Sequence, residues 1–234
     1  MTDNQQFEQL YTFALYMLGS ADEALATVRD VMAQHPNEPE TWLQALVAPF
    51  MLKKKTPRVD RFAELDDILR TYSTIPVDLS HPLVRGDVGR LNVLLAELQR
   101  TCLLTTLRGL TVERRAVFIL RHVLGLSVET CATVCGTTAT GIVVADVRGR
   151  QDLENYLGVR CEHLHAANPC HCAARLGNAL DRGLIRGVDG NDFDRGYPGI
   201  ARAPVAKVSD LYANLPRVRL RVVEARPGLH DIKS

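Results

Sequence analysis

The segment LTVERRAVFILRHVLGLSVETCATVCGTTATGIVVADVRGRQDLENYL, Leu110–Leu157, decides the fold of this chain. Apolar residues recur at helical spacing over residues 115–124, so this part is expected to form a helix that faces the core. Gly125 ends that helix. Ser127 then stands at an N-cap position, where its hydroxyl can accept a hydrogen bond from an orphan amide of the next helix. The segment therefore begins with two helices separated by a glycine break.

A second glycine separates a short helix from a longer one. The buried face of the short helix is expected to comprise Cys131, Ala132, Val134 and Cys135. Gly136 can adopt the left-handed backbone conformation that a tight turn requires, and Thr137 or Thr138 can cap a third helix that runs towards Leu157. A short helix, a glycine turn and a longer helix make up a helix-turn-helix, whose second helix lies in the major groove of DNA.

Several positions in this segment and just before it carry a family resemblance. They are Leu107, Leu110, Glu113, Arg114, the run AVFILRHVLGLSVE, Gly136, Arg148 and Arg150. These residues resemble region 4 of the extracytoplasmic-function sigma factors, small members of the sigma-70 family of bacterial transcription initiation. The N-terminal run FEQLYTFALYMLGSADEALATVRDVMAQ is similar to region 2 of the same family, and Thr41-Trp42-Leu43 resembles its TWL element.

The resemblance implies a sigma-factor-like protein that directs DNA-templated transcription initiation. Its implied partners are core RNA polymerase and promoter DNA, with an anti-sigma or other regulatory protein as a further candidate. The implied DNA contacts are Arg114, Arg115, Ser127, Thr138, Thr140, Arg148 and Arg150. The implied polymerase contacts are Asp22, Glu23 and Asp30. The alternative for the arginines is a solvated helical face.

The resemblance and the helical periodicity together predict an all-α fold of two helical domains with a small Cys/His-rich C-terminal extension. The predicted divisions are a region-2-like domain at 1–72, a linker at 73–87, a region-4-like helix-turn-helix domain at 88–158 and the extension at 159–234. Helices are expected at 8–18, 21–33, 42–52, 61–72, 88–107, 173–185 and 208–215. Apolar residues alternate with arginines over residues 217–222, as in an edge strand or in a tail that docks on another protein.

The third helix of the segment departs from the family pattern. Val143, Val144 and Ala145 stand where the family has lysine, serine and arginine, and Asp146 stands where the family buries a leucine. Phosphate affinity comes from Lys and Arg, and base reading needs donors and acceptors, so an aliphatic face contributes little of either. The helix is then expected to rotate onto a different packed seam. That seam comprises Ile142, Ala145, Gly149, Leu153 and Tyr156.

The N-terminal part also departs from the family. No aromatic residue lies between Met32 and Trp42, where the family has aromatic and basic residues that capture melted promoter bases. Stacking on aromatic rings contributes about 1–3 kcal/mol per base. Polymerase binding is therefore expected, and strand opening is not. These departures favour an alternative function, a divergent sigma-like protein-interaction or regulatory module that no longer reads DNA.

A cluster of cysteines and histidines follows the third helix. Its members are Cys161, His163, His165, Cys170, His171 and Cys172, in a pattern that resembles a cysteine-bearing extension of some of these sigma factors. Thiolates with imidazoles suit zinc in a closed tetrahedral site, with copper(I) or a redox role as alternatives. The predicted metal ligands are Cys161, His163, Cys170 and Cys172. The other possibility is three thiols packed beneath a loop with surface histidines. Cys102, Cys131 and Cys135 are expected to be buried small hydrophobes.

Composition narrows the functional class. The 28 basic and 27 acidic residues give a formal net charge of +1, which argues against a dedicated nonspecific nucleic-acid binder. No apolar run approaches the roughly 20 residues that span a bilayer, and the N-terminus lacks signal-peptide features, so a cytoplasmic protein without a membrane partner is expected. The sequence has no glycine-rich phosphate loop, no G-x-S-x-G elbow and no H-E-x-x-H pair, so we do not expect an enzyme.

Overall fold

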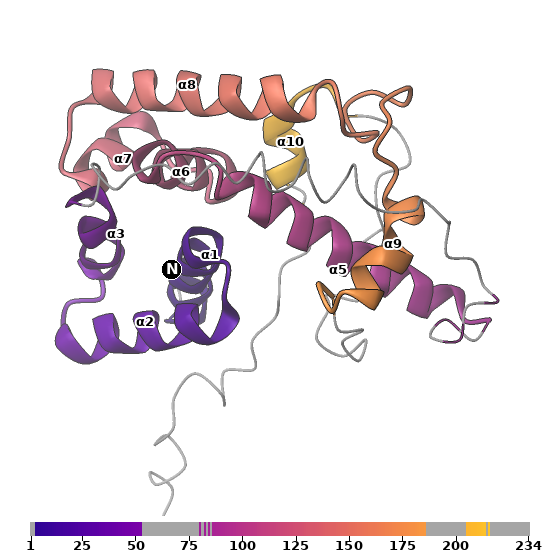
Figure 1. Cartoon of the computed structure of the whole chain (residues 1–234). Coiled ribbons are helices and arrows are strands. Elements are labelled where there is room, and N and C mark those ends of the chain that lie inside the picture. The colour runs from indigo at the N-terminus through magenta and orange to yellow at the C-terminus, as the bar shows by residue number, and fades with distance from the viewer. Residues whose placement is uncertain are drawn as a thin grey trace, which may run out of the picture.

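The computed structural model describes residues 3–52, 80, 82, 84, 86–185, 205–213 and 215 of the 234-residue chain. Helices are the only regular elements within these ranges (Figure 1), so the predicted all-α fold is confirmed. The predicted helix at 61–72, the predicted strand at 217–222 and most of the predicted linker at 73–87 lie outside the described residues.

Three helices form the N-terminal part, as predicted. They are α1 (Asp3–Leu18), α2 (Ala21–Gln34) and α3 (Trp42–Leu52). Ser20 caps α2, because its hydroxyl accepts a 3.3 Å hydrogen bond from the amide of Glu23. The indole of Trp42 donates a 2.7 Å hydrogen bond to the carbonyl of His35, which ties the start of α3 to the end of α2.

The central part is a series of helices that contains the predicted helix-turn-helix. Its elements are α5 (Val88–Leu107), α6 (Val112–Phe118), the π-helical turn η1 (Ile119–Val123), α7 (Val128–Cys135) and α8 (Ala139–Leu157). The helix predicted at 115–124 begins earlier than expected, because the hydroxyl of Thr111 caps it. At its end the helix becomes π-helical, because the amide N–H of Leu124 donates a hydrogen bond to the carbonyl of Ile119, five residues earlier.

The turn between α7 and α8 has the predicted chemistry. Gly136 takes a left-handed backbone with φ of +59°. Ser127 accepts a 3.1 Å hydrogen bond from an amide of α7, and Thr138, rather than Thr137, accepts one of 3.1 Å from the amide of Gly141 in α8. The two helix axes meet at 102°, within the roughly 90–120° range of helix-turn-helix motifs.

One hydrophobic core joins the N-terminal helices to the helix-turn-helix. Its fully buried members include Phe13 of α1, Leu46 of α3, Phe118 of α6 and Ile142 of α8. The guanidinium of Arg115 reinforces this junction by donating a 2.7 Å hydrogen bond to the carbonyl of Met17 at the end of α1. α3 packs against α6 and α7, so these two helices lie between the N-terminal helices and α8 (Figure 1).

Two short helices of the C-terminal extension pack on the central part. They are α9 (Cys172–Asp181) and α10 (Val208–Ala213). α9 lies against α5 over a second, smaller core made of Val84, Leu94, Leu98, Leu176, Ala179 and Ile185. The hydroxyl of Tyr212 in α10 donates a 3.1 Å hydrogen bond to the carbonyl of Leu103. The helix predicted at 173–185 ends before Gly183, whose φ is +64°.

No single helix in the described ranges is both long enough and apolar enough to cross a membrane; α7 and α8 have such a composition only when taken together across their 102° bend.

Candidate functional site

The inner face of α8 packs on α6 through the seam that the sequence predicts. All five of its residues, Ile142, Ala145, Gly149, Leu153 and Tyr156, are buried. Gly149 faces α6, since a Cβ at this position would lie 3.4 Å from the carbonyl oxygen of Arg114, in ordinary van der Waals contact. The predicted packed seam of α8 is therefore confirmed.

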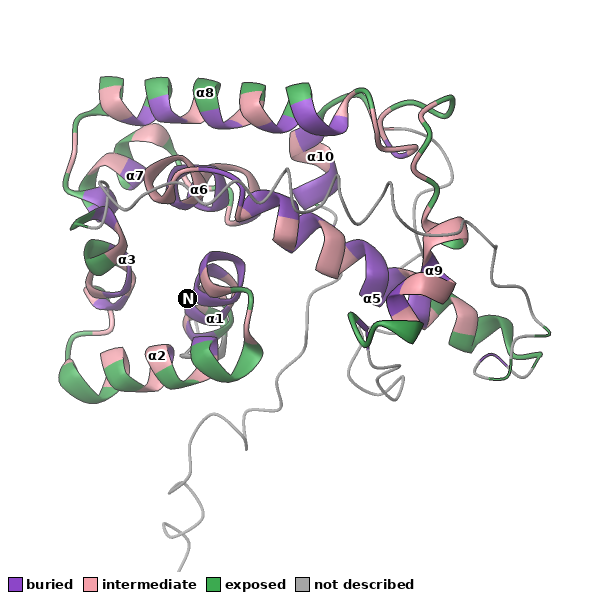
Figure 2. Cartoon of the chain, in the orientation of Figure 1, coloured by how far each residue is buried: buried purple, intermediate pink, exposed green. Residues whose placement is uncertain are grey.

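The outer face of α8 is open to solvent and largely aliphatic. Val143, Val144 and Val147 are 46%, 43% and 46% exposed. Thr140 and Arg148 are exposed on the same helix. Figure 2 shows this exposed face turned away from the rest of the molecule. A helix presented in this way is accessible to a macromolecular partner along its length.

Three of the four arginines expected at the DNA interface make contacts within the molecule. Arg114 pairs with Asp152 at 2.5 Å, and Nε of Arg150 lies 3.4 Å from a carboxylate oxygen of Asp146. Arg115 is directed inward, to the carbonyl of Met17 and to those of the turn before α6. Arg148 differs from these three, because it is exposed on the outer face of α8.

The carboxylate of Asp146 in α8 is paired with a side chain that the sequence analysis missed. Nε2 of His122 in η1 lies 2.6 Å from a carboxylate oxygen of Asp146, and both side chains are mostly buried. Burial alone would raise the pKa of Asp146, but the hydrogen bond from His122 and the charges of His122 and Arg150 outweigh it and lower the pKa. The ring of His122 also packs on Phe118, with centroids 4.8 Å apart. The pair therefore ties the π-helical turn to the middle of α8.

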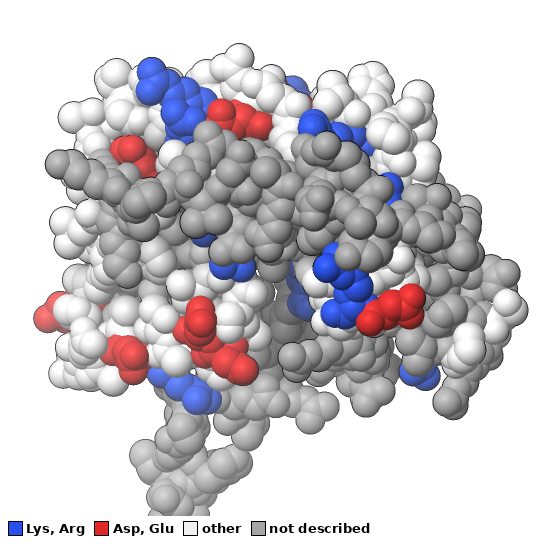
Figure 3. Space-filling view, in the orientation of Figure 1, with Lys and Arg blue, Asp and Glu red and all other residues white. Residues whose placement is uncertain are grey.

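The predicted polymerase contacts lie together on α2. Asp22, Glu23 and Asp30 are all exposed, and the first two occupy the first turn of the helix, where the helix dipole favours negative charge. Figure 3 shows acidic side chains gathered over the α2 side of this face, and both basic and acidic ones over the α8 side. The molecule thus presents an acidic surface and a helix-turn-helix surface on different helices.

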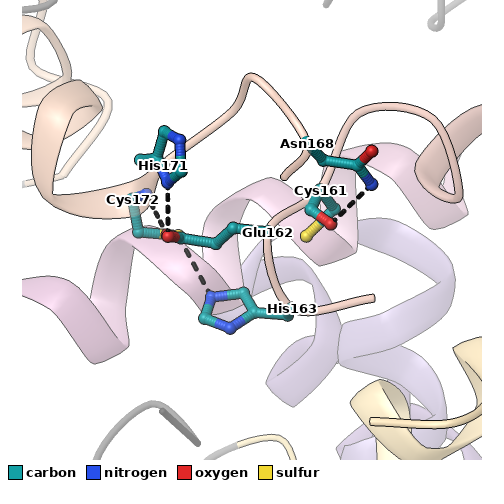
Figure 4. A network of polar contacts seen from close by, with 6 residues as sticks. All are labelled: Cys161, Glu162, His163, Asn168, His171 and Cys172. Atoms are coloured by element: carbon teal, nitrogen blue, oxygen red, sulfur yellow. Dashed lines mark hydrogen bonds and ion pairs between the residues drawn. The ribbon is translucent and has the colours of Figure 1, made fainter. Parts of the chain in front are cut away.

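The Cys/His cluster folds into a compact turn between α8 and α9 (Figure 4). An isolated bridge pairs Cys161 with Cys170, and the amide of Asn168 donates to the carbonyls of Gly158 and Cys161. This turn brings the start of α9 back towards the end of α8.

Two of the four predicted metal ligands lie together in this turn, with a third residue that the sequence analysis did not select. Nε2 of His163 lies 3.4 Å from Sγ of Cys172, and one ligand atom each of Glu162, His163 and Cys172 falls within 4.8 Å of the others. Glu162 accepts hydrogen bonds from the amide of Cys172 at 2.6 Å and from Nδ1 of His171 at 2.7 Å. The sulfurs of Cys161 and Cys170 lie outside this group.

These features define a helix-turn-helix module with a solvent-facing second helix. Residues 100–153 match the family model described as Sigma-70, region 4, so the chain carries a sigma-70 region 4 domain. The match covers less than a quarter of the chain, and the likeness of α1–α3 to region 2 stays a prediction. Comparisons with curated proteins and with solved structures gave no significant match.

Proposed function

We propose that this protein is a sigma-factor-like transcription factor whose α7–α8 pair contacts promoter DNA while the chain is held on core RNA polymerase. The observation that carries this proposal is the solvent-facing α8 within a region 4 domain. Helix-turn-helix proteins place the second helix in the major groove, and the side of α8 that would enter the groove carries the solvent-exposed Val143, Val144 and Val147.

The exposed side chains of α8 determine which contacts it would make with DNA. On the outer face of α8, Thr140 and Arg148 are exposed. Their hydroxyl and guanidinium groups can form hydrogen bonds with bases or phosphates. Val143, Val144 and Val147 suit apolar contact with the methyl groups of thymine. With few cations on this face, the free protein binds DNA weakly and with a shallow salt dependence. Polymerase therefore supplies most of the affinity in this proposal.

The acidic surface of α2 is the proposed contact with core RNA polymerase. Asp22, Glu23 and Asp30 are exposed along it, and an acidic surface suits a basic patch on the partner. Because bacterial RNA polymerase acts in the cytoplasm, this proposal also implies that the protein acts there. The same surface is also open to a regulatory protein of the anti-sigma type.

A second candidate function is favoured by the three exposed valines. Exposed apolar side chains that adjoin one another mark protein interaction sites more often than DNA contacts, and Arg114, Arg115 and Arg150 are already bound within the molecule. In this alternative, α8 docks on a protein partner, and the chain regulates transcription without reading DNA.

Selection from a pool of random-sequence DNA duplexes, with and without bacterial core RNA polymerase, separates the two candidates. We expect a motif to be enriched only when polymerase is present. Arg148→Ala should weaken binding to that motif and reduce the slope of log affinity against log salt by about 1. Arg90→Ala removes the same charge from the exposed start of α5 and should leave both quantities unchanged. Tight binding to polymerase with no enriched motif would support the protein-interaction alternative.

A further inference from the structure

Three side chains of the kinds that bind metals converge in the turn between α8 and α9 (Figure 4). One ligand atom each of Glu162, His163 and Cys172 lies within 4.8 Å of the other two. His163 is buried, and the other two are half-buried. The chain therefore holds a carboxylate, an imidazole and a thiol together at the base of the C-terminal extension.

The spacing of these atoms fits that of ligands around a tetrahedral metal ion. Zinc lies about 2.3 Å from a sulfur ligand and about 2.0–2.1 Å from an imidazole nitrogen, so at the tetrahedral angle these two ligands stand about 3.5 Å apart. Nε2 of His163 and Sγ of Cys172 are separated by 3.4 Å. These two atoms can therefore bind one ion almost where they stand, and a small shift of the Glu162 carboxylate brings it into the same shell.

The carboxylate of Glu162 is held in position by its own hydrogen bonds. One oxygen accepts a 2.6 Å hydrogen bond from the amide of Cys172, and the other lies 2.7 Å from Nδ1 of His171. Each carboxylate oxygen has two lone pairs, so either oxygen can also bind a metal ion. Hydrogen bonds of this kind orient the ligands of metal sites. These contacts therefore fix the carboxylate beside the thiol and the imidazole.

The three side chains lie where separate segments of the chain come together. Glu162 and His163 follow the end of α8, and Cys172 is the first residue of α9. The carbonyl of His163 also accepts a 2.8 Å hydrogen bond from the amide of Val205, which precedes α10. α9 packs on α5, and α10 packs on η1 and α8. A metal ion at this point would therefore connect the end of α8 to both helices of the extension.

We propose that Glu162, His163 and Cys172 bind one zinc ion that fastens the C-terminal extension to the helix-turn-helix domain. Zinc accepts thiolate, imidazole and carboxylate ligands, and three protein ligands leave its fourth position to a water molecule. A thiolate and an imidazole favour zinc over magnesium and calcium, which prefer oxygen ligands. This set keeps two of the ligands expected from the sequence and has the carboxylate of Glu162 in place of the thiols of Cys161 and Cys170.

The packing of the extension explains what the ion would contribute. α9 has 10 residues, and the small core that it shares with α5 is separate from the main core. A short helix on so small a core gains little from apolar burial, and the binding free energy of a structural zinc ion adds directly to folding. The ion would thus determine how often the extension detaches from the helix-turn-helix domain.

The first test counts the thiolates on the ion by titrating the full chain with cobalt(II), which gives a charge-transfer absorption for each thiolate it binds. The reductant is a phosphine, because a thiol reductant would itself bind cobalt. We expect about one cobalt per chain, the absorption of a single thiolate, and displacement of cobalt by zinc, which binds such sites more tightly. The absorption of three thiolates would indicate Cys161, Cys170 and Cys172 and would overturn the proposal, as would the absence of metal binding.

Variants identify the ligands. Cys172→Ser should abolish the thiolate absorption, whereas Cys161→Ser and Cys170→Ser remove free thiols of the same turn and should retain it in full. Glu162→Gln should lower zinc affinity by roughly tenfold or more, and His165→Gln, which removes an exposed imidazole of the turn, should bind zinc like the wild type. Absorption that is lost in Cys161→Ser and retained in Cys172→Ser would contradict the ligand set. Because the thiolates are counted on the wild type, the proposal is tested even if a variant fails to fold.

Amide hydrogen exchange of the wild type tests the fastening. The amide of Val205 bonds the carbonyl of His163, so it exchanges when this junction opens. Zinc at about 100 times its Kd should slow that exchange by roughly 100-fold, because opening then requires the ion to leave. The amide of Cys131 in α7, a helix with no residue in the site, should exchange at the same rate with and without zinc. Unchanged exchange at Val205 in the zinc-bound protein would overturn the fastening.

Discussion

At the scale of single residues, the pair of His122 and Asp146 decides how α8 is seated. An unpaired buried carboxylate is costly, and the sequence offers no sign of its partner, which lies 24 residues earlier in the chain. The π-helical turn places His122 opposite Asp146, and the turn itself has no clear sequence signature. Residue patterns could therefore show that Asp146 was unusual, but they could not show what compensated for it.

We predict that Asp146→Asn lowers the free energy of unfolding by about 1–3 kcal/mol at pH 7, because it removes a charged hydrogen bond between two mostly buried groups. Urea unfolding followed by circular dichroism measures the loss. Glu154→Gln neutralises an exposed carboxylate of the same helix and should change stability by less than about 0.5 kcal/mol. Equal losses in the two variants would show that the pair does not matter.

The same pair predicts a pH dependence. The pKa of Asp146 is lower in the folded chain than in the unfolded chain, so its contribution is complete above the unfolded value of about 4. The contribution is lost as the pH falls through the lowered pKa. The stability difference between the wild type and Asp146→Asn should therefore be present at pH 5, on the order of the value above, and should shrink below about pH 4. A difference that grows as the pH falls below about 4 would contradict this assignment.

At the scale of elements, the sequence was most informative about the helix-turn-helix. Ser127, Thr138 and Gly136 are local signals, because a cap or a left-handed turn depends on neighbouring residues alone. The packed seam of α8 also followed from helical periodicity. The grouping of Glu162 with His163 and Cys172 did not, because it depends on how the turn between α8 and α9 folds back on itself. Local rules thus predicted the elements, and the folding of the turn decided which ligand atoms lie together.

Two glycines of the helix-turn-helix should respond to alanine in opposite directions. Gly136→Ala should destabilise the protein by about 1 kcal/mol, because φ of +59° is unfavourable for a residue with a Cβ. Gly149→Ala should stabilise it by about 0.5–1 kcal/mol, because its backbone is helical and the new Cβ meets only an ordinary contact at 3.4 Å. Thermal unfolding of both variants tests this, and destabilisation by Gly149→Ala would mean that α6 and α8 approach more closely than described.

At the scale of the whole molecule, the N-terminal helices and the helix-turn-helix share one core, and only the outer face of α8 remains exposed to solvent. Arg115 is central to this arrangement, although its position in a region 4-like sequence suggested a DNA contact. The sequence could identify each half by its own pattern. It could not show that the halves pack together, because no local signal records which surfaces meet.

We predict that Arg115→Leu lowers the free energy of unfolding by about 2–3 kcal/mol, because it leaves the carbonyl of Met17 and those of the turn before α6 without their charged donor. Chemical unfolding monitored by tryptophan fluorescence reports this change, since Trp42 is the single tryptophan and is buried in the shared core. Arg148→Leu, on the exposed face of α8, should change stability by less than about 0.5 kcal/mol. A loss from Arg148→Leu as large as that from Arg115→Leu would contradict the internal role of Arg115.

The most direct test of the central claim is photo-crosslinking from α8 in the polymerase complex. A photoreactive amino acid replaces Val144, which is exposed at the middle of the outer face, and a second protein carries it at Arg90 on α5 as a control. With core RNA polymerase and the enriched DNA present, the account predicts a DNA crosslink from position 144 and none from position 90. Crosslinks from position 144 to protein alone would contradict promoter contact by α8.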